Sequence, residues 1–355
     1  MNKISRLWAL VITISILALG AVVANSNSPS SAEGGCAGQA YVTDIKGTAV
    51  SVINTSTNTL STTITVGTSP FGVAMTPDGT KAYVTNYIDD TVSVINTATG
   101  LVSATITVGN DPAGVAITPN GAFAYVTNEF DNTVSVINTA TGVVSAPIGV
   151  GTSPLGVAIT PNGAFAYVAN DGSSNVSVID TATNAVTTIS LADLSTAPQG
   201  VAITPNGDFA YVTSQDDGGG RVVVIDTSTN TFTTLIAGSQ PAGVAITPDG
   251  TKAYVTNEND GTVSVINTAT NSVVGSPISV GTDPAGVAIC PDGGFAYVAN
   301  GGDGTVSVIN TATNAVITTI PLAVGSGPQG VAITPVAVVP PVTPTDPAVV
   351  LKFTG

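Results

Sequence analysis

Residues 115–150 read VAITPNGAFAYVTNEFDNTVSVINTATGVVSAPIGV, which is a series of strand-like runs separated by turn residues. The runs, rich in Val, Ile and Thr, are Val115–Thr118, Ala122–Thr127, Thr133–Asn138 and Val143–Val150. Between the first two runs, Pro119 fixes φ near −65° and Gly121 permits a positive φ, as a tight β-turn requires. Four strands in about 42 residues predict one four-stranded antiparallel sheet per repeat.

The same pattern recurs along most of the chain, with successive Tyr-Val phrases 42 to 44 residues apart. These phrases begin at Tyr41, Tyr83, Tyr125, Tyr167, Tyr211, Tyr254 and Tyr297, and an Ala directly precedes each Tyr. A Gly-Val-Ala phrase starts at Gly72, Gly114, Gly156, Gly200, Gly243, Gly286 and Gly330. Neighbouring strand residues point to opposite faces, so a large Tyr and a small Ala suit a sheet packed between two others. The Tyr set therefore predicts core packing rather than a ligand-stacking surface.

The ends of the repeat region distinguish a closed ring from an open solenoid. The region begins at Tyr41 without its Gly-Val-Ala strand, and it stops at Gly330–Pro335 with only that strand. The two fragments add up to one complete repeat. A solenoid would need atypical capping units, and the sequence shows none. We therefore predict an all-β, seven-bladed β-propeller whose C-terminal strand, Val331–Thr334, completes the N-terminal blade.

The phrase Tyr-Val-Thr-Asn at Tyr83, Tyr125 and Tyr254 resembles the repeat of the YVTN β-propeller family, which includes archaeal surface-layer proteins. The Thr-Pro-Asp-Gly turn and the phrase Val-Ser-Val-Ile-Asn-Thr-Ala-Thr extend the match over about residues 39–335. The resemblance implies a seven-bladed propeller that is secreted or on the cell surface, commonly without a defined activity. The phrase departs from the family pattern at Ser214 and, more mildly, at Ala169 and Ala299.

The N-terminus has the pattern of an export signal. Lys3 and Arg6 precede an apolar run at residues 7–23, and the small residues before Asn25 predict cleavage after Ala24. An uncleaved membrane anchor is the alternative. The predicted organisation is a signal peptide at 1–24, a linker at 25–38, the propeller at 39–335 and a Pro-rich tail at 336–355. Either reading places the protein outside the cytoplasm: secreted, periplasmic or on the cell surface.

The composition excludes several functions. The formal net charge is −15, so the chain repels nucleic acid and anionic lipid surfaces. The sequence has no His, which removes Ser-His-Asp and Cys-His catalysis and the commonest zinc ligand. No phosphate-binding glycine motif is present, and we predict no cofactor and no metal. Calcium bound by loop carboxylates stays an alternative, although no calcium-loop spacing repeats.

The loops after the Tyr strands vary between repeats, whereas the Thr-Pro-Asp/Asn-Gly turns are nearly uniform. Because function on a rigid scaffold is usually carried by variable loops, we expect the face with these loops to be the contact face; tolerant, solvated loops are the alternative. The loop candidates are Asp89, Glu129, Phe130, Asp216, Asp217, Glu258 and Asp303. Residues between the Pro and Gly that start each repeat should line the channel mouth, notably Phe71, Leu155, Gln199 and Gln329. That set and its Ala counterparts are neutral, which suits an uncharged ligand or a plugged, water-filled channel.

The two cysteines, Cys36 and Cys290, should lie close together. Cys36 precedes the first strand of the N-terminal blade, and Cys290 ends the inner strand of the last complete repeat. In a closed ring these blades are neighbours and both positions lie on the same rim. An exported protein can hold a disulfide there, so we predict a Cys36–Cys290 bridge that locks the ring.

Taken together, these patterns favour a non-catalytic, monomeric, exported propeller whose variable loops bind a protein or glycan. Two alternatives stay open: a lactonase-like hydrolase that uses loop carboxylates, and a purely structural element of a surface assembly. Whether the chain is an enzyme is not decided by its sequence, which leans against catalysis.

Overall fold

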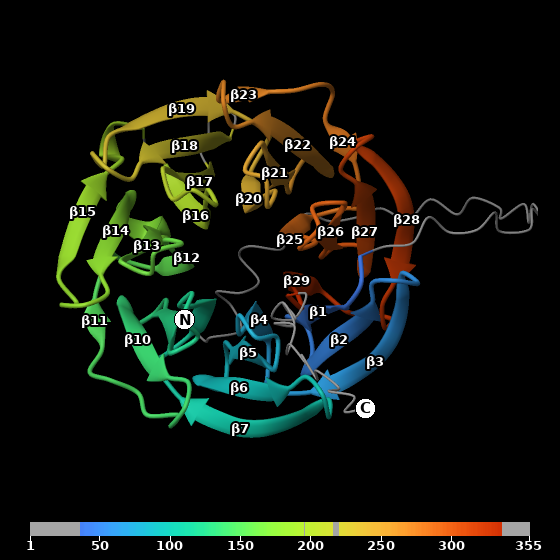
Figure 1. Cartoon of the computed structure of the whole chain (residues 1–355), viewed down its shortest axis with the longest axis horizontal. Helices are drawn as coiled ribbons and strands as arrows, with labels where there is room; N and C mark the ends of the chain where they lie inside the picture. The colour runs from blue at the N-terminus through green and yellow to red at the C-terminus, as the bar shows by residue number, and fades with distance from the viewer. Residues whose placement is uncertain (1–35, 195, 216–219, 336–355) are drawn as a thin grey trace, which may run out of the picture.

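The computed structural model of the chain describes residues 36–194, 196–215 and 220–335. In this part of the chain, seven antiparallel sheets stand around a central axis as the blades of a closed β-propeller (Figure 1). Six sheets have four strands, and in the seventh the outer strand is split into two short pieces. The predicted fold is therefore confirmed, including the number of blades.

The strands follow the chain from the inside of each blade to its outside. Blade 1 consists of β29 (Pro328–Ile333), β1 (Gln39–Asp44), β2 (Ala49–Asn54) and β3 (Thr59–Thr65). Blade 2 consists of β4 (Pro70–Met75), β5 (Lys81–Asn86), β6 (Thr91–Asn96) and β7 (Leu101–Thr107). Blade 3 consists of β8 (Pro112–Ile117), β9 (Phe123–Asn128), β10 (Thr133–Asn138) and β11 (Ile148–Gly149). Blade 4 consists of β12 (Pro154–Ile159), β13 (Phe165–Asn170), β14 (Asn175–Asp180) and β15 (Val186–Ser190).

The remaining blades repeat this order. Blade 5 consists of β16 (Ala197–Ile203), β17 (Phe209–Gln215), β18 (Arg221–Asp226) and β19 (Phe232–Ile236). Blade 6 consists of β20 (Pro241–Ile246), β21 (Lys252–Asn257), β22 (Thr262–Asn267), β23 (Ser272–Val273) and β24 (Ile278–Ser279). Blade 7 consists of β25 (Pro284–Ile289), β26 (Phe295–Asn300), β27 (Thr305–Asn310) and β28 (Ala315–Pro321). Two short 3-10 segments, η1 (Asp171–Ser173) and η2 (Ala192–Leu194), lie in loops. Among the residues placed by the structure, no helix has the length and apolar character needed to cross a membrane.

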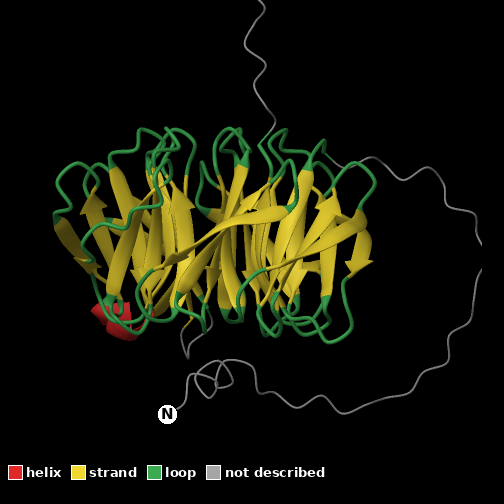
Figure 2. Ribbon diagram, turned by 90° about the horizontal axis from the view of Figure 1, so that it is seen from below, coloured by secondary structure: helices red, strands yellow, loops and turns green. Residues whose placement is uncertain are grey.

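The ring has two different faces. One, which we call the loop face, carries the blade-to-blade connections such as 67–69 and the loops after the second strand of each blade, such as 87–90. The other, which we call the turn face, carries the turns between the first two strands, such as 76–80, and between the last two, such as 97–100. The red helical segment in Figure 2 marks the loop face, at the lower edge of the ring.

Adjacent blades pack through the Tyr and Ala pattern of the repeat. In one interface Tyr83, Val92 and Val94 of blade 2 contact Ala124, Val126 and Ile137 of blade 3, and all six are buried. Each of the seven repeat Tyr side chains is at most 2% exposed, and each preceding Ala is fully buried. Five of the Tyr hydroxyls donate to turns of the next blade, as Tyr254 Oη does to the Thr311 carbonyl at 3.2 Å, while Tyr41 Oη donates to Gln39 Oε1 of its own blade. The Tyr set is thus confirmed as core.

Around the axis the inner strands approach one another closely at the Gly of each Gly-Val-Ala phrase. A Cβ on Gly330 would lie 2.6 Å from the Phe71 carbonyl oxygen of the next blade, and the other six glycines are confined in the same way. Five Thr hydroxyls bridge these contacts, as Thr43 Oγ1 does by accepting from Gly330 N at 2.8 Å and donating to Phe71 O at 2.7 Å. Ala169 and Ala299 replace this Thr in blades 4 and 7, so those two junctions lack the bridge.

The ring closes through β29, which pairs antiparallel with β1. Ala40 faces Ile333 and Tyr41 faces Ala332, and backbone bonds between Gln39 and Thr334 extend the pairing. Blade 1 is thus assembled from both ends of the described chain, as the incomplete first and last repeats predicted.

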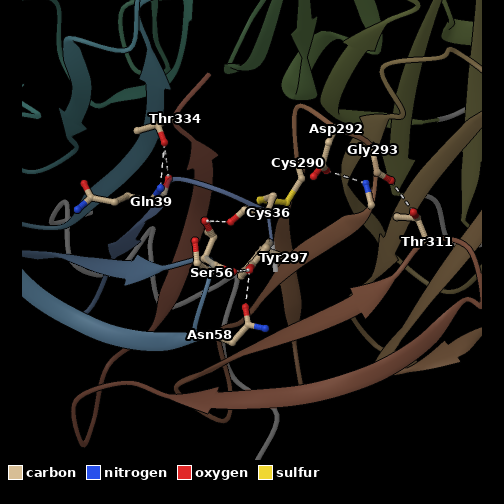
Figure 3. The surroundings of a disulfide bond; sticks show 12 residues. Cys36, Gln39, Ser56, Asn58, Cys290, Asp292, Gly293, Tyr297, Thr311 and Thr334 are labelled. Carbon is tan, nitrogen blue, oxygen red and sulfur yellow. Dashed lines mark hydrogen bonds between the residues drawn. A yellow bond between two sulfur atoms is a disulfide. The ribbon is translucent and has the colours of Figure 1, made fainter. Parts of the chain in front are cut away.

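A disulfide joins Cys36 and Cys290 across the junction of blades 1 and 7, with a Cα–Cα distance of 6.0 Å (Figure 3). Cys36 lies three residues before β1 and Cys290 directly follows β25, so the bond is on the turn face. Both residues are buried, at 2% and 0% exposure, among Tyr297 and other core side chains. The bond crosses the junction between blades 7 and 1, which lacks the Thr hydroxyl bridge because Ala299 stands in place of the Thr.

The outer strands of two blades are shorter than their sequence patterns suggest. Val143–Val150 was expected to be one strand, but only Ile148–Gly149 forms β11, with an isolated bridge from Val144 to Ile137. Pro147 lacks a backbone N–H and interrupts the ladder there, as Pro277 does between β23 and β24. Of the other predicted segments, residues 1–24, residues 25–35 of the linker and the 336–355 tail lie outside the described residues.

Candidate functional site

A cavity of about 140 Å³ opens at the loop-face end of the central channel. Two positions of the repeat supply most of its wall: the residue between the Pro and Gly of each inner strand, and the fourth residue after each repeat Tyr. The first position supplies Phe71, Leu155, Gln199, Ala242, Ala285 and Gln329. The second supplies Ile45, Tyr87, Glu129, Asp171, Glu258 and Gly301. Lys46, Asp283 and Gly327 complete the lining, so every blade contributes to the site.

The structure therefore brings together six of the residues proposed from the sequence. Phe71, Leu155, Gln199 and Gln329 lie at the channel mouth, while Glu129 and Glu258 reach it from the variable loops. Ala113, the blade 3 counterpart of Phe71, is fully buried and does not line the cavity.

The inner-strand residues at the channel mouth are neutral, as their sequence indicates, but the cavity as a whole also contains charged side chains. Glu129, Asp171, Glu258 and Asp283 all line the cavity, against one positive side chain, Lys46. The candidates chosen from the sequence, at the inner-strand position and in the variable loops, did not include Asp171, Asp283 or Lys46. Counting four residues from each repeat Tyr would have found Asp171, since that position lines the cavity in six of the seven blades.

Amide and hydroxyl groups from neighbouring positions hold the acidic side chains in place. Gln199 Nε2 donates to Asp171 Oδ1 at 2.9 Å, and Gln215 Nε2 donates to Glu258 Oε2 at 3.2 Å. Tyr87 Oη donates to Glu129 Oε2 at 2.8 Å. Each of these three bonds joins two adjacent blades, so the carboxylates are positioned by the ring itself rather than by a single loop.

Burial shifts the pKa of two of these acids. It raises the pKa of Glu258 to about 7, and the negative charge of Asp283 adds to the effect, while the bond from Gln215 opposes it. Burial also raises the pKa of Asp171, against the lowering effect of the bond from Gln199. Glu258 therefore changes charge near neutral pH, which a solvated glutamate does not do.

Replacing Glu258 with Gln should make the protein more stable at alkaline pH. A carboxyl group whose pKa rises on folding favours the folded state below its unfolded pKa, near 4.5, and that contribution is lost as the pH rises through about 7. At pH 8 we expect Glu258→Gln to raise the free energy of unfolding by roughly 2 kcal/mol, since solvent reduces the full effect of the shift. At pH 4 the two proteins should be equally stable. Urea unfolding between pH 4 and 8 measures this; two parallel curves would contradict the assignment.

The acidic side chains come from blades 3, 4 and 6 and from the connection to blade 7, and an apolar sector lies beside them. Blades 1 and 2 supply Ile45, Phe71 and Tyr87, and the Phe71 and Tyr87 ring centroids are 6.0 Å apart. Lys46 stands at the other edge of this sector, where its Nζ donates to the Gly301 carbonyl at 3.2 Å. The cavity thus combines aromatic surface, amides and carboxylates within one small space.

The other loop candidates have different roles. Asp89 Oδ2 accepts from Thr68 N at 2.7 Å, and Asp303 Oδ2 accepts from Thr282 N at 2.8 Å. These carboxylates fix the blade-to-blade connections and do not line the cavity. Phe130 is 54% exposed on the loop face, outside the cavity lining. Asp216 and Asp217 lie outside the described residues.

The residue types of the site restrict its chemistry. In the described ranges, no group of three or more His, Cys, Asp and Glu side chains is arranged to hold a metal ion. The described lining can accept hydrogen bonds and balance positive charge through its carboxylates, and Glu258 can also exchange a proton near pH 7.

A family model described as "Lactonase, 7-bladed beta-propeller" matches residues 102–237, which is the region of blades 2 to 5. No curated protein matches the sequence.

Several solved structures share the fold. A chain of Kuenenia stuttgartiensis hydrazine synthase is similar with a TM-score of 0.72 and 23% identity, covering 82% of this chain and 99% of that one. A functionally unknown protein from Desulfotomaculum acetoxidans DSM 771 is similar with a TM-score of 0.71 and 17% identity, covering 84% of this chain and 99% of that one. The dihydro-heme d1 dehydrogenase NirN, in complex with DHE, is similar with a TM-score of 0.60 and 14% identity, covering 86% of this chain and 77% of that one. At these identities the similarity shows the fold and does not extend to function.

Proposed function

We propose that this chain is an exported propeller of the YVTN type that binds a protein or glycan partner through its loop face, without catalysing a reaction. The cavity at the channel mouth carries this proposal. It gathers side chains from all seven blades at positions that differ from blade to blade, whereas the turn face repeats nearly the same turns. Variation concentrated around one cavity on a rigid ring is typical of a binding site.

Export is supported by the predicted signal at 1–24 and by the disulfide, which persists in oxidising compartments. Repeated turns and Tyr-Val-Thr-Asn phrases support the YVTN assignment. Secreted and surface propellers of this kind need no active site to function as scaffolds.

A capture experiment tests the proposal. The purified chain is immobilised and exposed to a glycan array and to envelope proteins of the source cells. A loop-face variant carries Glu129→Gln, Glu258→Gln and Phe130→Ser. A turn-face variant carries Asp78→Asn and Asp249→Asn, which Asn120 shows to be tolerated, because Asn120 Oδ1 accepts from Thr118 as Asp78 does from Thr76. We expect at least a tenfold loss of capture for the first variant and none for the second. Equal capture by both would contradict the proposal.

The second candidate is a lactonase-like hydrolase. Two observations favour it: the family match over residues 102–237, and a glutamate with a pKa of about 7, the range that suits a general acid or base. A panel of simple lactones, assayed at pH 7 with and without added divalent metal, separates the two functions. Hydrolysis that disappears in Glu258→Gln would establish the enzyme and displace the binding proposal.

A further inference from the structure

The size of the channel cavity limits what can enter it. At about 140 Å³, it is close to the roughly 150 Å³ of an engineered cavity that binds benzene. A single side chain or an equally small molecule fits this space, while drug-sized ligands occupy pockets of about 300 Å³ or more. A glycan chain could touch the rim but could not be enclosed.

The walls of the cavity define the chemistry of the group that fits. Four carboxylates line it against one Lys, whose ammonium group already donates to a backbone carbonyl. The Phe71 and Tyr87 rings form the adjacent sector, and aromatic faces attract organic cations. Leu155, Ala242 and Ala285 add apolar surface at the level of the inner strands.

Other charge types fit this arrangement less well. An anion would meet four acidic side chains, and the net charge of the chain would repel it before contact. A bare metal ion would need several closely arranged ligands, which the described residues do not supply. A cation with an apolar stem can use both the carboxylates and the aromatic wall.

We propose that the channel cavity binds an ammonium group on a short apolar stem, such as the tip of a lysine side chain on a protein partner or a small free amine. This inference rests on the proposed binding function and makes it more specific, because the loop face would then recognise a positively charged group on its partner. Carboxylates of blades 3, 4 and 6 and of Asp283, which directly precedes blade 7, hold the ammonium group, and the wall formed by blade 2 covers the stem.

Direct titration tests the inference with defined probes. Nα-acetyl-lysine methylamide and cadaverine are titrated into the full chain at pH 8 and low salt by calorimetry. The matched neutral probe is Nα,Nε-diacetyl-lysine methylamide, which keeps the stem and removes the charge. We expect saturable binding of both amines, at least tenfold weaker binding of the neutral probe, and weaker binding as salt is raised. Equal affinity for charged and neutral probes would overturn the inference.

Variants locate the site. Glu129→Gln and Asp283→Asn each keep the shape of the side chain, and Asn is tolerated at the positive φ of residue 283. Each should weaken amine binding about tenfold, since a hydrogen bond to a charged group contributes roughly 1.5 kcal/mol or more. Phe71→Leu, which removes an aromatic ring without disturbing a carboxylate, should weaken it several-fold. Asp249→Asn on the turn face should change nothing; an equal loss there would overturn the inference.

The same probes separate the sources of the ammonium group. Preference for the blocked lysine over cadaverine indicates a protein partner, and the reverse indicates a free amine; either supports the inference. Amines that fail to bind while loop-face variants still lose partner capture would overturn this inference and leave the proposed function intact. If the loop-face variants keep both partner capture and amine binding, the proposed function and this inference are both contradicted.

Discussion

A chain that ends at Gly327 should not form a stable ring. This truncation removes β29, the inner strand of blade 1, and leaves β1 with an unpaired edge facing the channel. It deletes the partly buried side chains of Val331 and Ile333 from the interface with blade 7, each contributing up to about 1.5 kcal/mol by burial, together with several strand hydrogen bonds of about 1 kcal/mol each. Those losses approach the total stability of a typical domain, about 5 to 15 kcal/mol. We expect no cooperative thermal transition in circular dichroism.

The matched control is a chain that ends at Pro335, which keeps β29 and removes only the tail. It should melt within a few degrees of the full chain. A synthetic peptide of residues 328–335, added in excess to the shorter truncation, should restore a cooperative transition by supplying the strand in trans. A truncation at Gly327 that melts like its control would show that closure through β29 is dispensable.

Removing the disulfide should give the second largest effect. Its cysteines are 254 residues apart in sequence, and the loop-entropy relation assigns about 5 kcal/mol to a cross-link of that span. The bond also spans one of the two blade junctions that lack the Thr bridge, the one at Ala299. We therefore expect Cys36→Ser/Cys290→Ser to lower the free energy of unfolding by several kcal/mol, measured from urea unfolding midpoints.

Reductant supplies the control. It should lower the unfolding midpoint of the natural chain toward that of the double variant and leave the variant unchanged. Because both cysteines are buried, reduction in the absence of denaturant should be slow. Thiol labelling of both cysteines in unreduced, folded protein would show that the bond is not formed.

The fold was predictable because each blade repeats the same local requirements. Pro119 and Gly121 define a turn, alternating Val and Ser define strands, and Ala beside Tyr125 defines two packing faces. Ring closure followed from complementary incomplete repeats at Tyr41 and Gly330. The turn, strand and packing signals are local, and ring closure follows from adding up the repeats, so all of them can be recognised from the sequence alone.

The candidate site was predictable only in part, for a physical reason. Glu129 and Glu258 were found because their loops vary, but variability alone does not distinguish a residue that lines the cavity from one that fixes a connection. The position four residues after the repeat Tyr does make that distinction. Asp171 has that same register, at the start of the 3-10 turn η1, whereas Asp283 lies in a blade-to-blade connection, at a positive φ. Asp89 and Asp303, equally variable in context, are instead used to fix connections.

Residues 36 and 335, the two limits of the described chain, both lie on the turn face, since one precedes β1 and the other follows β29. Any attachment made through either terminal segment would therefore hold the ring by its turn face. The cavity would then point away from the attachment, toward the surrounding medium, and many copies anchored on one support would all present their acidic mouths in the same direction.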